Sequence, residues 1–151
     1  MAGKTMWQSD KALSLLKGNT VSGASATWVN LFTTLPTSDQ NVSGGSLGTE
    51  WIIDRVEVFQ TSASSPYWSE IVSDGNLRYI ENEGTITWTY EDITVAPILD
   101  DVAVKGIGIW DGPTGSTTEN LLYWSAFDQT RTVSHSNEVI FATGDLKVRE
   151  D

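Results

Sequence analysis

The sequence predicts a single all-β domain, a β-sandwich of the jelly-roll type, with one short helix near its N-terminus. Roughly seven or eight short segments are rich in β-branched and aromatic residues, and polar, glycine-containing turns separate them. The length of 151 residues suits one ordinary domain. The chain has no cysteine, so its stability is expected to come from a packed core and not from disulfides.

The first part of the chain, residues 1–24, is predicted to be an arm that precedes the β-sandwich domain of residues 25–151. A helical stripe of apolar residues spans residues 11–17, and Gly18 supplies the stop. Such a helix has about two turns, too few to be stable alone in water, so it must dock. Docking on its own domain and docking on a neighbouring protein are both open. The candidate anchor residues for a neighbour are Trp7, Leu13 and Leu16.

The clearest strand signal lies at residues 85–90. Ile86, Trp88 and Tyr90 alternate there with threonines, as the two-residue period of a half-buried strand requires. Other β-branched and aromatic segments end in turn sequences and complete the predicted set. These further strands are residues 27–33, 51–59 with a kink near Asp54, 102–110, 121–127, 139–142 and 146–148.

The large aromatic residues divide into a core set and a surface set. The chain has seven tryptophans, most of them within strand patterns, where a large ring fills the space between sheets. Tyr67 and Trp68 instead follow Pro66 in a predicted loop, so they are candidates for a surface contact or for stacking on a host-surface glycan. The tryptophans assigned mainly to the core are Trp28, Trp88, Trp110 and Trp124.

The charge of the chain excludes some partners. It carries 20 acidic and 9 basic residues, a formal net charge of −11. Because nucleic-acid binders present clustered lysine and arginine to phosphate, that class is excluded, and an anionic membrane surface is disfavoured for the same reason.

No apolar run reaches the roughly 18–20 residues of a membrane-spanning helix, and no export signal is expected at the N-terminus. The acidic excess favours solubility and fits a cationic partner.

Catalytic and metal-binding motifs are weak. His135 stands alone in a polar loop, and no nucleophile elbow, zinc motif or phosphate loop occurs. The carboxylate pairs Glu81/Glu83 and Asp100/Asp101 are expected beside turns as solvated groups, which leaves a glycoside hydrolase as the weakest hypothesis. The sequence therefore predicts a structural or adhesive protein that is not an enzyme and holds no cofactor or metal.

Several segments, in order over most of the chain, resemble small bacteriophage tail-fibre-like and virion decoration proteins. Residues 26–37 (ATWVNLFTTLPT) and 106–115 (GIGIWDGPTG) carry the resemblance best. Residues 49–51 and 136–138 depart from the family pattern, and residues 60–79 match none of it. The remaining similar segments are 11–18, 42–46, 120–124 and 133–146.

This resemblance implies a non-enzymatic phage structural protein with a β-sandwich fold, located in the virion. Because the chain has no heptads or triple-β repeat from which to build a shaft, we expect a surface accessory subunit, a capsid decoration (cement) or collar protein. The alternative is a tail-fibre or receptor-binding module that binds carbohydrate. In the first case the expected partners are other virion proteins, major capsid or tail proteins, and the expected assembly is a homotrimer.

Overall fold

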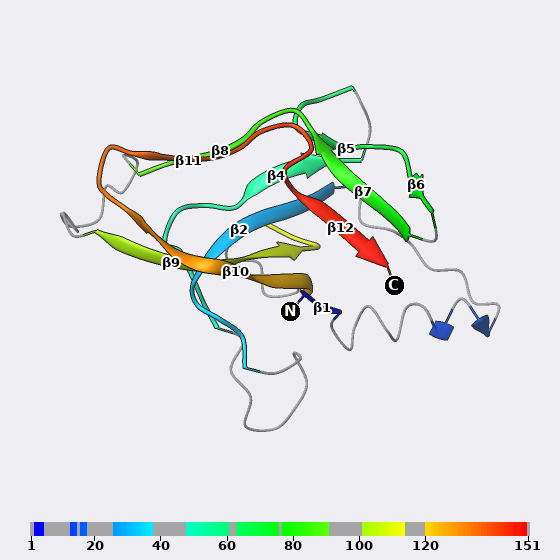
Figure 1. Ribbon diagram of the computed structural model, residues 1–151, viewed down its shortest axis with the longest axis horizontal. Coiled ribbons are helices and arrows are strands. Elements are labelled where there is room, and N and C mark those ends of the chain that lie inside the picture. Colours follow the sequence, from blue (N-terminus) through cyan, green and yellow to red (C-terminus); the bar gives the residue numbers. More distant parts are fainter. Residues whose placement is uncertain are drawn as a thin grey trace.

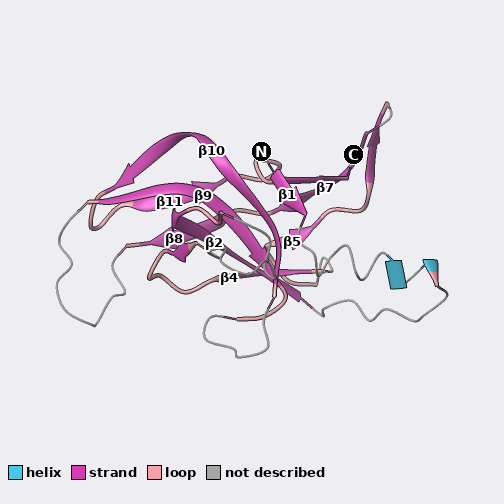
Figure 2. Cartoon of the chain, turned by 90° about the horizontal axis from the view of Figure 1, so that it is seen from below, coloured by secondary structure: helices cyan, strands magenta, loops and turns pink. Residues whose placement is uncertain are grey.

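The computed structural model describes residues 2–4, 13–14, 16–17, 26–37, 48–60, 63–75, 77–90, 101–113 and 120–150. Within these ranges the chain is nearly all β, which confirms the predicted class (Figures 1 and 2). None of the helical residues in these ranges belongs to a helix long and apolar enough to cross a bilayer. The strands are β1 (Ala2–Lys4), β2 (Ala26–Thr34), β3 (Thr49–Glu50), β4 (Val56–Phe59), β5 (Tyr67–Trp68), β6 (Val72–Asp74), β7 (Leu77–Glu83), β8 (Ile86–Thr89), β9 (Val102–Trp110), β10 (Leu121–Val133), β11 (Glu138–Phe141) and β12 (Lys147–Glu150).

Most of the described strands join in one curled sheet. Its order is β1-β10-β9-β2-β4-β5-β7-β12, with β3 beside β2 and β6 beside β7, and only the β4–β5 contact is parallel. A separate two-stranded ribbon, β8–β11, runs along one side of the molecule, opposite β9 and β10 (Figure 1). The described part does not divide into two large sheets, so the β-sandwich and its jelly-roll subtype both remain predictions.

The main core lies between the curled sheet and the β8–β11 ribbon. Ile86, Trp88 and Tyr90 are buried, as the alternation of residues 85–90 predicts. They pack in one cluster with residues of β2, β4, β9 and β10, such as Leu31 and Ile109. Burial of large apolar side chains is the main term that stabilises such a domain. The ribbon therefore completes the core of the sheet.

The predicted core tryptophans are confirmed only in part. Trp88 and Trp110 are buried, but Trp28 and Trp124 are only half-buried. Two tryptophans outside that predicted set, Trp51 and Trp68, lie in the main core. The alternation within a strand predicts the face of the sheet on which a ring lies. How far that ring is buried depends on segments that are distant in the sequence.

A second, smaller cluster lies on the opposite face of β2 and β9. Phe32 and Trp110 pack with ring centroids 5.3 Å apart, and Leu121 joins them. Gly108 makes room for this pair, because a Cβ there would lie 2.5 Å from Trp110 Cη2 and 2.7 Å from Phe32 Cε2. The centre of the sheet is thus buried on both faces.

Arg55 covers this second cluster with a buried charge. Its guanidinium lies 4.2 Å from the centroid of the Trp110 ring. It donates two hydrogen bonds to Glu50, at 2.9 Å from Nε and 2.6 Å from Nη2, and a third, at 2.8 Å, to the carbonyl oxygen of Gly112. The bidentate geometry offsets the cost of burying the charge. One side chain therefore joins the segment after β3 to the turn after β9.

Asn30 ties the same segment to β2. This side chain is fully buried, and its Nδ2 donates to the carbonyl oxygens of Trp51 (3.2 Å) and Ile53 (3.0 Å) and to Glu50 (3.2 Å). Its Oδ1 accepts from the backbone N–H of Leu31 at 2.8 Å. Residues 51–53, predicted as strand, make no ladder in the structure, because these side-chain bonds take up their carbonyl groups.

Strands β5, β6 and β7 correct the sequence prediction, which placed Tyr67 and Trp68 in a loop and the Glu81/Glu83 pair beside a turn. The residues of β7 are mostly polar, so the sequence shows no apolar alternation that would predict a partly buried strand. Its Asn82 is fully buried, and the side chain binds the carbonyl oxygens of Gly84 (2.8 Å) and Ala142 (3.0 Å) and the N–H of Leu146 (2.9 Å). Asn82 thus occupies a buried position of β7 where the alternation of a strand would lead one to expect an apolar residue.

Little of the predicted N-terminal helix falls within the described residues. The N–H of Lys17 donates to the carbonyl oxygens of Leu13 and Ser14, both at 3.2 Å, which is a single turn. The remainder of residues 11–17 lies outside the described ranges, and within those ranges no helix forms an element of its own. The short helical pieces lie away from the sheet (Figure 2).

Replacing Arg55 tests the buried network. We expect Arg55→Ala to lower the free energy of unfolding by about 3 kcal/mol, because Glu50 and the Gly112 carbonyl lose their partner. Urea denaturation measures this, with Arg78→Ala, an exposed arginine, as the control that should change stability by less than about 0.5 kcal/mol. Equal midpoints for both variants would show that the network contributes nothing.

Candidate functional site

The predicted surface pair Tyr67 and Trp68 lies beside a hollow at the end of the curled sheet. Strand β5 pairs in parallel with β4 at Phe59 and antiparallel with β7, where Tyr67 lies opposite Glu83. The hollow has a volume of about 540 Å³. Its lining residues are Gln60, Tyr67, Trp68, Ser69, Glu70, Ile71, Val72 and Glu83.

Trp68 does not offer a stacking face. Its side chain is 8% exposed and belongs to the main core, and its Nε1 donates to Thr27 Oγ1 at 2.7 Å. A ring that is buried on the core side and hydrogen-bonded at its polar end is not free to stack on a sugar. This burial argues against Trp68 as a stacking surface, the glycan contact itself stays a prediction, and Trp68 anchors β5 to β2.

Tyr67 and its neighbours remain at the surface. Tyr67 is half-buried, and Ile71 is 65% exposed, an unusual position for a large apolar side chain. The carboxylates of Glu70 and Glu83 line the same hollow. Apolar side chains beside two carboxylates are complementary to a protein partner that presents a basic side chain.

A second hollow, the β10 hollow, lies on strand β10, where the sequence pattern predicted no site. The register of β10 on β9 shifts between Ala126, which pairs with Gly106, and Arg131, which pairs with Val104. The extra residues of β10 between these pairs therefore face Lys105 alone, which makes a large β-bulge. The hollow has a volume of about 740 Å³ and is lined by Ala126, Phe127, Asp128, Gln129, Thr130 and Arg131.

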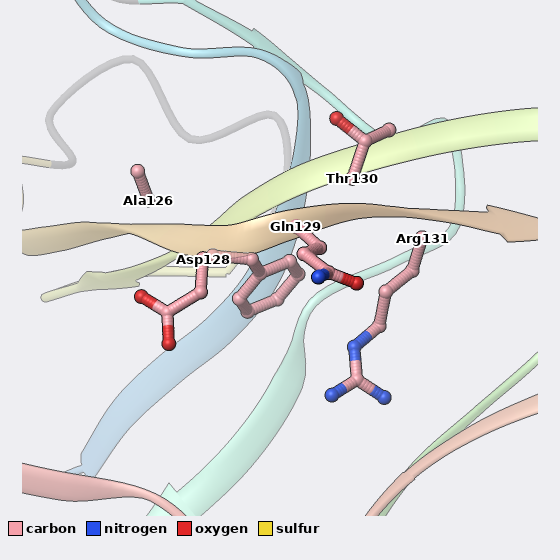
Figure 3. Close-up of a pocket in the computed structure, with 6 residues that line it drawn as sticks. Ala126, Asp128, Gln129, Thr130 and Arg131 are labelled. Atoms are coloured by element: carbon pink, nitrogen blue, oxygen red, sulfur yellow. The ribbon is translucent and has the colours of Figure 1, made fainter.

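The bulge changes the direction of the side chains. Figure 3 shows Asp128, Gln129 and Arg131 on one side of the ribbon, and Ala126 and Thr130 on the other. In a regular strand, neighbouring residues point to opposite faces, so Asp128 and Gln129 share a face only because of the bulge. The local pattern does not reveal this bulge, because the predicted strand ends at Phe127, where the apolar pattern ends.

Of the predicted catalytic candidates, Glu83 lines the hollow beside Tyr67, while His135 and Glu81 make structural contacts. His135 is exposed, with Nδ1 3.0 Å from Ser136 Oγ and its ring against Tyr90. Glu81 lies on β7 and forms an ion pair with Lys147 at 2.9 Å. By accepting a hydrogen bond, Glu81 raises the pKa of Lys147 above its ordinary value.

The other acidic candidates do not assemble within the described ranges. Asp101 is exposed, and Asp100 lies outside those ranges. No group of three or more histidine or acidic side chains within the described part of the chain is arranged to hold a metal ion.

Two of the three predicted anchor residues are described. Leu13 is 55% exposed and Leu16 is 84% exposed, so neither packs into the core of its own domain. Trp7 lies outside the described residues. For the part that is described, docking of the helix onto its own sheet is not observed.

The described ranges form an all-β domain whose two hollows lie on exposed parts of its strands. The chain belongs to the family described as podophage GP4 fiber I protein gp80, whose model matches residues 4–149. This match confirms the resemblance to phage tail-fibre-like proteins and places the chain in the virion, in association with other virion components. No curated protein matches the chain.

The neighbouring residues Tyr67 and Trp68 give a test of burial against exposure. We expect Trp68→Ala to lower the free energy of unfolding by about 3–5 kcal/mol, because it leaves a cavity and removes the partner of Thr27. Tyr67→Ala should cost only about 1 kcal/mol, since its ring is already partly in solvent. Thermal or urea unfolding of the two variants measures the difference. Equal losses would contradict the assignment of Trp68 to the core.

Proposed function

We propose that the chain is a non-enzymatic structural subunit of a phage fibre, and that it works as a homo-oligomer, with a trimer as the expected state. The family match over residues 4–149 carries this proposal, because it spans nearly all of the described β domain and names a fibre protein. The large core supports a rigid body suited to a structural part. Light scattering of the purified chain measures the number of copies.

The capsid decoration (cement) or collar role that the sequence favoured is the second candidate. It was inferred from the absence of a shaft repeat and from the compact acidic chain, with a net charge of −11. A fibre can obtain its shaft from other proteins, so the absence of a repeat in this chain does not argue against a fibre role. The family description therefore favours the fibre over the capsid surface.

The N-terminal arm is the proposed attachment to the rest of the particle. Leu13 and Leu16 expose apolar side chains within one helical turn, and their burial against a neighbouring virion protein would supply association energy. The acidic surface of the chain adds attraction to a cationic partner. In this proposal the arm attaches the subunit, while the β domain remains free to make other contacts.

Gold-labelled antibody against the chain locates it on purified particles. We expect label at the fibres and none over the capsid shell, and particles made without the chain should have filled capsids with incomplete fibres. The reason is that a fibre subunit contributes to one appendage and not to the shell lattice. Label spread evenly over the shell would instead support the decoration role.

The arm can be tested with a single charged substitution. We expect Leu16→Asp to reduce incorporation into particles by about tenfold or more, because an unpaired carboxylate is costly to bury. Quantitative immunoblotting of particles complemented with the variant measures incorporation. Ser14→Asp adds the same charge to the same turn and is the matched control.

Both arm variants should retain the wild-type melting temperature, because neither position packs into the core of the β domain. Wild-type incorporation of Leu16→Asp would reject the arm as the attachment.

A further inference from the structure

The β10 hollow has the features of a built binding surface. Asp128, Gln129, Thr130, Arg131 and Thr132 are all exposed, so this stretch of β10 departs from the in-and-out burial of a regular strand. It nevertheless lies within one continuous strand, with paired residues on both sides of the bulge. The hollow is therefore held between fixed ends and is not part of a free loop.

The polar groups of the hollow have unused hydrogen-bonding capacity. Within the part of the chain that the structure describes, no hydrogen bond or ion pair engages the side chains of Asp128, Gln129 or Arg131. Figure 3 shows the three pointing to the same side of the strand. Together they offer a carboxylate acceptor, an amide that donates and accepts, and a guanidinium fork of donors. Such a set binds a ligand that both donates and accepts hydrogen bonds.

An apolar group completes the lining. Phe127 lines the hollow and packs against the main core, with its ring centroid 6.2 Å from that of Phe141. Its ring is half-buried, so part of it contacts solvent, and its position is fixed by the core. A fixed aromatic surface next to planar polar groups suits a ligand with an apolar face and polar edges.

We propose that the β10 hollow binds a neutral saccharide. A sugar ring has hydroxyl groups that donate and accept at its edge and a C–H face that can lie on an apolar floor, which matches Asp128, Gln129, Arg131 and Phe127. The volume of about 740 Å³ falls in the range of small-molecule sites. A contact between this site and a host-surface glycan in the particle rests on the proposed fibre function. The saccharide affinity of the isolated chain does not depend on that function.

Charge argues against other ligand classes. Asp128 and Arg131 carry opposite charges, so the lining has no excess of one sign for a charged ligand to match. The whole chain has a net charge of −11, which repels a phosphorylated or acidic sugar chain at long range. A neutral polyhydroxylated ligand fits these conditions best.

The test uses the full chain and defined oligosaccharides. Neutral oligosaccharides of glucose, galactose, mannose and rhamnose, and acidic ones that contain a hexuronate, are titrated into the isotope-labelled protein and followed by NMR. We expect a neutral oligosaccharide to shift the amide signals of residues 126–132. Asp128→Asn and Arg131→Ala should each weaken that binding about tenfold or more, because each removes a charge-assisted hydrogen bond.

Matched variants control for general effects. Asp74→Asn and Arg78→Ala make the same chemical changes at exposed strand positions outside the hollow, and they should leave the affinity unchanged. All of these positions are exposed, so thermal melts should show wild-type stability. Binding that the hollow variants do not weaken, binding of acidic oligosaccharides alone, or no binding of any probe at millimolar concentration would each overturn the proposal.

The outcomes also separate this inference from the proposed function. A chain located at the fibre that binds no oligosaccharide would retain the fibre role and lose the saccharide site. A chain that binds a neutral oligosaccharide through Asp128 and Arg131 but labels the capsid shell would retain the site and lose the fibre role.

Discussion

The buried guanidinium of Arg55 is the interaction on which the rest of the described structure depends. A charge removed from water is tolerated only when its donors are satisfied, so Arg55 fixes the position of each of its partners. Those partners belong to separate parts of the chain, Glu50 to β3 and Gly112 to the turn after β9, and the Trp110 ring packs against the guanidinium. The network therefore holds the two central strands of the sheet in register and covers their second face.

The burial of β2 and β9 on both faces determines where the sheet can depart from regular pairing. Strands β2 and β9 are buried on both faces, and a shift of one residue would exchange their inward and outward side chains. Towards the other end of β9, cover is needed on one face only, and there β10 accommodates a bulge. The departure costs some ladder bonds, but it places polar side chains together on one face, which a regular strand cannot do.

The surface features of the chain are spatially divided. The exposed leucines lie on the N-terminal arm, the hollow beside Tyr67 lies at β5, and the β10 hollow lies in the part of β10 beyond its pairing with β1. A fibre subunit must hold its neighbours and also present a surface outward. Separate surfaces on a rigid core allow both contacts at once, because neither needs the other to move.

The sequence by itself determined the fold class, the strands with clear alternation or long apolar runs, and the family. The strands at residues 85–90 and 102–110 can be recognised from the sequence, because burial of one face produces alternating apolar residues and burial of both faces produces a continuous apolar run. The ordered set of similar segments over most of the chain, residues 26–37 and 106–115 among them, indicated a phage tail-fibre-like protein, and the family match confirms it.

Only the tertiary structure decided which polar residues are structural and which are available. Asn30, Arg55 and Asn82 are polar residues that the fold buries, and Trp68 is an apparent loop aromatic that the fold places in the core. Asp128, Gln129 and Arg131 look like an ordinary polar stretch until pairing with β9 makes a bulge of them. Burial and register depend on partners far along the chain, and such partners leave no local signal in the sequence.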